Sequence, residues 1–265
     1  MSIKVDACAA QHLGDRKEQQ DRVAILPHSR YRGVALAVVA DGMGGHTGGA
    51  LAAEQVVYTA RNNLDLFSFS GDTPRQLLES SMNEAHTMIK ASRFINEKDP
   101  HSTAVMLLLQ PGQVCWGYCG DSRLYHFRGN RLIERTVDHS YVEYLVSTGR
   151  ISPEQALTHP SRNILLASLG GKEAPTITFG QTTELLPGDA FVLCSDGLWA
   201  YFDDEEFGSM VSENSARRAC EALIDKARQR AQGAGDNISL AIIKLVDALP
   251  GKPVPPPLQP PRGSL

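Results

Sequence analysis

The sequence predicts an α+β fold with largely antiparallel sheets, and three observations support this prediction. Helical and strand-like segments come in separate runs and do not alternate as β-α-β units. The strand-like segments are short, apolar or alternating, and are separated by turn residues. Gly129-Asn130, between Phe127 and Arg131, has the length and composition of a two-residue hairpin loop, which joins antiparallel strands.

In the N-terminal part, strands are expected over residues 3–10 and 22–26, with a polar segment between them. A continuous apolar run over 34–40 is typical of a strand buried on both faces, and a glycine-rich loop follows it. The next segment, about 49–62, has helical composition, and we expect this helix to bury Leu51, Val56 and Val57.

A second helix has clear start signals: Thr73 as N-cap, Pro74 in the first helical position and Gln76 completing a capping box. After it we expect strands over 103–109, 114–119 and 124–127, and a helical insertion over 141–156 with a second capping box at Ser152-Pro153-Glu154-Gln155. A strand over 190–194, an amphipathic helix over 216–227 and a last strand over 238–246 are expected to follow. The tail, 249–265, is rich in proline and is expected to be extended and disordered. A PxxP docking pattern at 257–260 is a less favoured interpretation of that tail.

Composition excludes several classes of protein. The 265 residues carry a formal net charge of −4 with scattered Lys and Arg, so nothing indicates nucleic-acid binding. The N-terminus lacks the regions of a signal peptide, and no apolar run approaches membrane-spanning length. Five cysteines without zinc-type spacing favour a reduced, cytoplasmic protein.

Asp41 ends the most apolar strand and is followed by Gly42, Met43 and Gly44. A carboxylate at a strand end beside a tight glycine turn suits a hard metal ion, which prefers carboxylate and carbonyl oxygens. For this stretch alone, a strand–helix turn with an acidic first residue explains the pattern equally well.

Four further acids sit at strand ends in polar or glycine-containing turns: Asp21, Asp121, Asp196 and Asp236. Each alone is most often a turn former or a cap. If the strand ends converge at one edge of a sandwich, however, several carboxylates meet and repel one another unless a cation neutralises them. The pattern therefore predicts a divalent metal site, with two ions bridged by one carboxylate as one form of it.

Seven motifs follow one another along the chain: Arg16-x-x-Gln19-Gln20-Asp21, Asp41-Gly42-Met43-Gly44-Gly45-His46, Ser102-Thr103-Ala104, Gly120-Asp121-Ser122-Arg123-Leu124-Tyr125, Asp138-His139-Ser140, Ser195-Asp196-Gly197-Leu198 and Gly235-Asp236-Asn237-Ile238. They stand in the order found in the bacterial metal-dependent Ser/Thr protein phosphatases, the type-2C (PPM) family, and the chain resembles that family over residues 3–247.

The resemblance implies a β-sandwich of two antiparallel sheets flanked by helix pairs, in one catalytic domain over 1–248 with a flap insertion at about 140–165. It also implies a site. By this analogy Asp41 bridges two Mn²⁺ or Mg²⁺ ions, the Gly42 carbonyl binds one of them, and Asp196 and Asp236 hold the other. Asp121 resembles a ligand of a third, weaker ion, and Arg16 the arginine that grips the substrate phosphate.

The implied chemistry is hydrolysis of phosphoserine or phosphothreonine by direct attack of a water held between two ions, without a phosphoenzyme. Cys194 is then a small core residue and not a nucleophile, and His139 and His159 are expected to cap or pack. The implied partners are phosphorylated proteins linked to a Ser/Thr kinase in signal transduction, and we expect a monomer.

Two residues depart from the family pattern. Many relatives carry a glutamate ligand where this chain has Gln20, so we expect the second ion to bind more weakly or to use Asp21 through a water. Met43 replaces a histidine proposed as general acid in eukaryotic relatives. His46 either donates the proton to the leaving oxygen or makes a structural hydrogen bond, and metal-bound water is a third source of the proton.

Two alternatives stay open. A non-catalytic phosphoprotein-binding or regulatory module could retain the fold, although the core acids and Arg16 are all present. A phosphatase of regulatory-antagonist phosphoproteins or of small phosphate esters would need the same residues, because a metal centre recognises only the phosphate.

Overall fold

The computed structural model describes residues 3–44, 47–96 and 99–247, apart from the side chains of residues 47 and 94–96. The N-terminal elements are β1 (Ile3–His12), β2 (Asp21–Pro27), β3 (Ala35–Met43), α1 (Thr47–Leu66), α2 (Pro74–Asn96), β4 (His101–Ser102), β5 (Ala104–Gln110) and β6 (Gln113–Cys119). They are followed by β7 (Arg123–Arg128), β8 (Arg131–Arg135), α3 (Tyr141–Ser147), α4 (Pro153–Leu157), β9 (Thr178–Thr182), β10 (Asp189–Cys194), α5 (Asp196–Trp199), α6 (Asp204–Ser212), α7 (Ala216–Ala231) and β11 (Ile238–Asp247).

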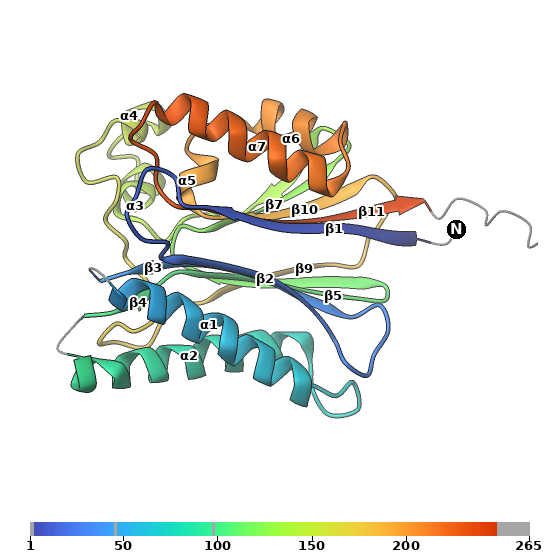
Figure 1. Cartoon of the computed structure of the whole chain (residues 1–265). Coiled ribbons are helices and arrows are strands. Elements are labelled where there is room, and N and C mark those ends of the chain that lie inside the picture. The colour runs from blue at the N-terminus through green and yellow to red at the C-terminus, as the bar shows by residue number, and fades with distance from the viewer. Residues whose placement is uncertain (1–2, 45–46, 97–98, 248–265) are drawn as a thin grey trace, which may run out of the picture.

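These strands form two antiparallel sheets that pack face to face, as the sequence predicted (Figure 1). One sheet has the order β1-β11-β10-β7-β8, and the other has the order β2-β3-β5-β6-β9 with β4 paired to β3. Helices α6 and α7 cover the outer face of the first sheet, and α1 and α2 cover the outer face of the second (Figure 1). The result is an α-β-β-α sandwich, which confirms the expected fold class.

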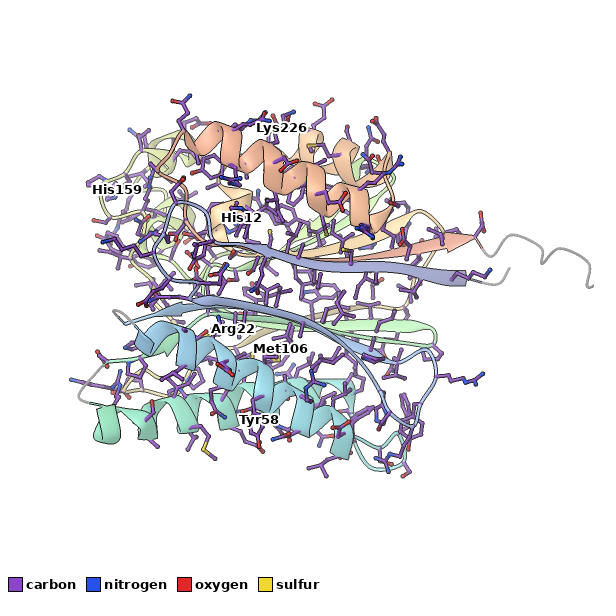
Figure 2. The ribbon with its side chains drawn as sticks, viewed as in Figure 1. His12, Arg22, Tyr58, Met106, His159 and Lys226 are labelled. Carbon is purple, nitrogen blue, oxygen red and sulfur yellow. The ribbon has the colours of Figure 1, made fainter. Side chains whose placement is uncertain are left out.

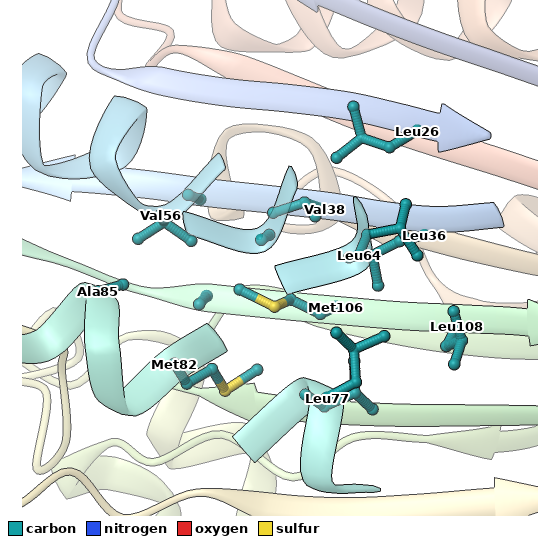
Figure 3. Close-up of a cluster of buried hydrophobic side chains, with 14 of the residues drawn as sticks. Leu26, Leu36, Val38, Val56, Leu64, Leu77, Met82, Ala85, Met106 and Leu108 are labelled. Carbon is teal, nitrogen blue, oxygen red and sulfur yellow. The ribbon is translucent and has the colours of Figure 1, made fainter. Parts of the chain in front are cut away.

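Three apolar layers hold the sandwich together. One lies under α1 and α2 and includes Val38, Val56, Met82 and Met106, all shielded from solvent (Figure 3). The second lies under α6 and α7, and the third fills the space between the sheets. Because β3, β5 and β10 contribute to layers on both faces, their sequences are apolar throughout and do not alternate.

The helices follow their expected apolar faces with one correction. On α1 most buried positions are small or β-branched, among them Ala52, Ala53 and Val56, and Leu64 is buried near its end. Leu51, by contrast, is 54% exposed, so its predicted burial is wrong. Val57 packs against the cluster as expected. Figure 2 shows the two sides of this layer, with Tyr58 on the outer face of α1 and Met106 beneath it on β5. The small residues let α1 approach the sheet closely.

Several boundaries differ from the sequence-based expectations. β3 continues past residue 40 to Met43 because Gly42 and Met43 pair with Ser102 and His101 of β4, a contact between distant segments. The hairpin loop 129–130 is confirmed by the pairing of Arg128 with Arg131. Elements β4, β9, α5 and α6 were not predicted; each is short or polar and depends on tertiary contacts.

Both predicted capping boxes form. Thr73 Oγ1 accepts from Gln76 N–H at 3.2 Å and Gln76 Oε1 accepts from Thr73 N–H at 2.9 Å, and Ser152 and Gln155 repeat the arrangement at α4. None of the described helices combines the length and apolar character needed to cross a bilayer. The predicted tail, 249–265, lies outside the described residues.

Candidate active site

The predicted acidic turns converge at one end of the sandwich. Asp21 opens β2, Asp41 lies near the end of β3, and Asp196 follows β10. Asp121 and Asp236 lie two residues before the first residues of β7 and β11. Because neighbouring strands are antiparallel, the end of one lies beside the start of the next, so all five acids occupy the same edge, beside α3, α4 and α5 (Figure 1).

Asp41 is held by the segment that enters β5. Its backbone N–H donates to Thr103 Oγ1 at 3.0 Å, and its carbonyl accepts from Thr103 N–H at 2.8 Å and from the Ser102 hydroxyl at 3.1 Å. Thr103 Oγ1 in turn lies 2.7 Å from Ser122 Oγ, next to Asp121. The main chain is therefore fully bonded, and the Asp41 carboxylate is left to face the pocket.

Gly42 lies where a side chain has no room. A Cβ at this position would come 1.9 Å from the Gly49 carbonyl oxygen and 2.7 Å from that of Gln20. Gly49 has the same restriction from the other side, because its Cβ would lie 2.6 Å from the Gly42 carbonyl oxygen. The start of α1 thus packs directly against the backbone that follows Asp41, which explains the glycines at 42 and 49.

Asp21 and Asp196 meet through Ser195. Asp21 is directly opposite Asp41 in the β2–β3 register and is 1% exposed. Its Oδ2 accepts from the Ser195 hydroxyl at 2.7 Å, and Ser195 Oγ accepts from Ser239 N–H at 3.0 Å. Asp21 therefore lies under the pocket wall, while Asp196, the first residue of α5, lines the pocket.

Asp236 contacts the arginine predicted to bind phosphate. Arg16 Nη2 lies 2.6 Å from Asp236 Oδ2, and the Arg16 side chain is 60% exposed. Asp236 Oδ1 accepts from the Asn237 N–H at 2.8 Å. Arg16 therefore stands at the open mouth of the site, within reach of both the carboxylates and an incoming ligand.

Asp121 is supported by a buried cation. Trp199 Nε1 donates to the Asp121 carbonyl at 3.0 Å, and the Arg123 guanidinium lies 3.5 Å from the centre of the Trp199 ring. Arg123 also makes a bidentate pair with Asp138, both contacts being 2.8 Å. This network fixes the turn that carries Asp121 and the residue just before the flap.

A pocket of about 290 Å³ lies at this edge. It brings together six of the predicted site residues with flap and loop residues, and its lining is Arg16, Gln20, Asp41, Gly42, Met43, Asp121, Asn163, Leu165, Asp196, Asp236 and Asn237. A second pocket of about 220 Å³ shares Arg16, Gln20, Asp236 and Asn237 with it and extends toward Lys17 and Glu18. The carboxylates thus form the floor of a site that opens along the Arg16 loop.

These acids are shielded from water and repel one another, and the fold does not supply enough positive charge to neutralise them. Burial is the main cause of the raised pKa of each: about 7 for Asp21, about 8 for Asp121 and about 6 for Asp196. The pKa of Asp41 also lies well above its ordinary value, first through burial and then through the charges of Asp21 and Asp196. Such a cluster favours either protons or a cation from solution.

The donors fit a hard divalent cation that also takes carbonyl and water oxygens. Within the described ranges, no three His, Cys, Asp or Glu side chains form by themselves a group that could hold a metal ion. Asp41, Asp196 and Asp236 supply carboxylate oxygens around the pocket, and Gly42 lines it as well. Mg²⁺ and Mn²⁺ characteristically bind through a few carboxylates and complete their shells with carbonyls and waters.

The other predicted residues fall into two groups. His46 lies outside the described residues, so its proposed role as general acid stays a prediction. Cys194 is a fully buried core residue whose thiol pKa is raised by burial, which agrees with its predicted packing role. His139 stacks on Tyr118 with ring centres 4.9 Å apart, and His159 bonds within its own turn, as expected. Figure 2 places His159 at the flap.

Sequence reasoning missed three residues that line the pocket. Asn163 and Leu165 come from the flap segment after α4, and only the three-dimensional fold brings them into the same pocket as Arg16. Asn237 stands in a quoted motif but carried no predicted role. Its position directly between an acidic turn and a strand was the available signal, because asparagine commonly bonds to nearby backbone there.

Comparisons with known proteins agree with this geometry. A family model described as "Protein phosphatase 2C" matches residues 8–241. The serine/threonine protein phosphatase PstP of Mycobacterium tuberculosis is 33% identical over 223 residues, covering 83% of this chain and 42% of that protein. The serine/threonine phosphatase stp of Listeria welshimeri is 33% identical over 218 residues, covering 79% of this chain and 84% of that protein. The chain thus spans about two fifths of the length of the mycobacterial relative.

Solved structures share the fold. The serine/threonine phosphatase of S. agalactiae superposes with a TM-score of 0.81 at 26% identity, covering 93% of this chain and 100% of that one. The catalytic domain of PstP, solved in complex with two manganese ions, gives a TM-score of 0.75 at 29% identity, covering 93% of this chain and 100% of that one.

Proposed function

Because the chain belongs to the protein phosphatase 2C family, we propose that it is a metal-dependent phosphatase of phosphoserine and phosphothreonine in proteins. The observation that carries this proposal is one pocket that holds Asp41, Asp196 and Asp236 together with Arg16. Carboxylates for divalent cations and a guanidinium for the phosphate are the two recognition elements that phosphoryl transfer to water requires.

The residues that would hold Mn²⁺ or Mg²⁺ are Asp41, with the Gly42 carbonyl, and Asp196 with Asp236. Asp121, which also lines the pocket, would serve a third and weaker ion. Asp21 is hydrogen-bonded to Ser195 and buried below the pocket lining, so it would not contact an ion directly. It would influence the ions through a bridging water or through the effect of its charge on the Asp41 carboxylate. When bound, two such ions lower the pKa of a water and neutralise charge on the phosphoryl oxygens.

Arg16 would bind the substrate phosphate. Its guanidinium is permanently charged, forms two parallel hydrogen bonds with a phosphate and stands at the exposed mouth of the pocket. The contact with Asp236 holds the side chain over the carboxylates before any substrate arrives. This pre-organisation reduces the entropy that binding would otherwise cost.

The open shape of the site favours a protein substrate. Arg16 and the pocket that extends toward Lys17 and Glu18 lie at the surface, where the backbone of an extended peptide can reach them. We propose phosphorylated proteins linked to a Ser/Thr kinase as the partners, in a cytoplasmic protein that acts as a monomer. The absence of a basic stripe in the sequence supports a partner other than nucleic acid.

Hydrolysis of a phosphothreonine peptide by the purified chain tests the proposal, with Mn²⁺, with Mg²⁺ and with chelator. We expect phosphate release that requires the metal, is lost in Asp41→Asn and is strongly reduced but still measurable in Arg16→Ala. A folded, metal-loaded protein that releases no phosphate yet binds the phosphopeptide would contradict the proposal and favour a phosphoprotein-binding module.

A second arm of the same assay separates protein substrates from small phosphate esters. The peptide is compared with para-nitrophenyl phosphate at equal metal concentration. We expect a higher kcat/KM for the peptide, because only the peptide reaches the surface around Lys17 and Glu18. An equal or lower value would favour small phosphate esters.

A further inference from the structure

Asn237 makes an unusual pair of contacts. Its side chain is buried, with 5% of the residue exposed, and both ends of its carboxamide bond to the loop that carries Arg16. Oδ1 accepts from the Gln20 N–H at 2.7 Å, and Nδ2 donates to the Leu13 carbonyl at 2.8 Å. A single side chain on the turn before β11 therefore joins the two ends of a loop more than 200 positions away in sequence.

The same loop meets the same turn a second time. Asp15 N–H donates to the Gly235 carbonyl at 3.0 Å, and Asp15 Oδ2 accepts from the Gly235 N–H at 2.8 Å. At Gly14, whose φ is +64°, a Cβ would lie 1.9 Å from the Asp236 carbonyl oxygen. The loop is thus pressed against the turn at backbone distance, with hydrogen bonds on both sides of Arg16.

This attachment decides where Arg16 stands. The Arg16 side chain is mostly exposed, and Lys17 and Glu18 beside it are exposed as well, so no core packing holds this part of the loop. Apart from the contact of Arg16 with Asp236, its position depends on the ends of the loop. Because the partner turn also carries Asp236, a movement of the loop would change the distance between the phosphate-binding guanidinium and the carboxylates.

We propose that Asn237 is a positioning residue whose two side-chain hydrogen bonds, to Leu13 and Gln20, hold the Arg16 loop in register with Asp236. This inference rests on the proposed phosphatase function. It assigns Asn237 no contact with the reacting atoms. Its effect on hydrolysis acts through the position of Arg16. A displacement of about 1 Å in a group that positions the substrate can lower the rate by about 100-fold.

The first test measures amide hydrogen exchange in the full chain without substrate. In Asn237→Ala we expect faster exchange across residues 13–20, including the Gln20 N–H, while the amides of β11 keep their wild-type protection. Asn214→Ala is the matched control, since the Asn214 side chain also donates to a backbone carbonyl, that of Met210 at 2.9 Å, at the end of α6. Unchanged exchange in Asn237→Ala would overturn the proposal.

The second test is a double-mutant cycle on phosphopeptide hydrolysis. We expect Asn237→Ala to lower kcat/KM by about 10- to 100-fold, mainly through KM, and to have little further effect in an Arg16→Ala background. Asn214→Ala should stay within about twofold of wild type. Losses that simply add in the double variant would show a structural role independent of Arg16 and would overturn the proposal.

A further variant covers the case in which Asn237→Ala does not fold. Asp15→Ala removes the acceptor for Gly235 N–H without touching residue 237 and should give the same exchange pattern and the same non-additivity with Arg16→Ala, at smaller amplitude. If it leaves exchange and kinetics unchanged, the proposal fails. An inactive wild-type protein would contradict the proposed function alone, because the exchange comparison needs no activity.

Discussion

One acid lies at the start of strand β10 and another lies just beyond its end, and their charges are compensated in opposite ways. At its start, Asp189 is fully buried and accepts from Arg128 Nε at 2.7 Å and from Leu186 N–H at 2.8 Å. Burial alone would raise its pKa, but these donors outweigh burial, so the pKa is lowered. Beyond the other end, Asp196 faces other acids, and its pKa is raised to about 6, first by burial and then by Asp236.

The difference separates a structural acid, Asp189, from Asp196, which we propose to be functional. The fold supplies Asp189 with its own cation and backbone donor, so nothing from solution is needed. Asp41, Asp196 and Asp236 have mainly one another as charged neighbours, and the positive charge of Arg16 lies at the exposed rim of the pocket. An acidic cluster that the protein leaves under-compensated is poised for an external cation.

The largest expected effect is the loss of turnover in Asp196→Asn. Removing a carboxylate from the repelling cluster should lower metal-supported kcat/KM by more than about 100-fold, since even indirect metal partners cost about 10- to 100-fold. The unfolding midpoint of the metal-free protein should not fall. Phosphopeptide hydrolysis and a thermal melt on the same preparation check both statements, and an unfolded variant would contradict the functional assignment of Asp196.

Metal and pH should affect stability together. In the folded chain the pKa of Asp21 is about 7 and that of Asp121 about 8, whereas the ordinary value is 3.8. At pH values between the ordinary and the folded pKa, the folded chain therefore holds more protons than the unfolded chain. The stability of the metal-free protein should therefore fall as the pH rises through about 7 to 8. Saturating Mn²⁺ should restore about 2.7 kcal/mol at 100 times its Kd.

Melting curves at about pH 6.5 and about pH 8.5 measure this linkage, with and without chelator. The histidines with lowered pKa, His86, His126 and His139, destabilise the fold toward lower pH, so they oppose the expected change and reduce its size. A metal-free protein that is equally stable at both pH values would show that the acids are neutralised from within the fold.

At the other end of β10, the same chemical change should act on stability and not on catalysis. Asp189→Asn removes the charge that compensates Arg128, and we expect a loss of about 2 kcal/mol in the free energy of unfolding. The kcat/KM of the folded fraction should match wild type. Denaturant melts and active-site-normalised kinetics measure the two quantities, and a metal-dependent defect would erase the contrast with Asp196.

The smallest expected effect comes from increasing the negative charge of the pocket. Gln20→Glu adds one carboxylate to the pocket lining. We expect the Mn²⁺ concentration for half-maximal activity to fall by about tenfold, with kcat changed much less. Metal titrations of the wild type and the variant at one pH decide this, and an unchanged half-saturation would mean that residue 20 does not contact the ion.

The helix starts, the hairpin and the apolar strands could be predicted because their causes are local. The Thr73 and Ser152 capping boxes and the Gly129-Asn130 loop depend only on residues within a few positions. Segments 34–40 and 190–194 are apolar enough to be strands in any fold. The wrong prediction for Leu51 shows the limit of local causes. The helix itself was predicted correctly, but the sheet against which it packs decided which of its residues are buried.

The extension of β3, the strand β9 and the helix α6 could not be predicted, because each depends on a partner distant in sequence. Gly42 and Met43 are a strand only because β4 pairs with them, and nothing between residues 40 and 44 indicates this. Asn163 and Leu165 reach the pocket only through the path of the flap. Short elements of this kind are stabilised by tertiary packing more than by their own propensity.

By itself, the sequence determined the identity of the acids, the apolar strands that carry them and the order of the motifs, since these follow from residue type and local spacing. Only the tertiary structure decided that the acids share one pocket, that Asp21 lies beneath it and Asp196 within it, and that Asn237 joins the Arg16 loop to the Asp236 turn. The physical reason is that electrostatic coupling and burial depend on distances between segments far apart along the chain, and local sequence does not encode those distances.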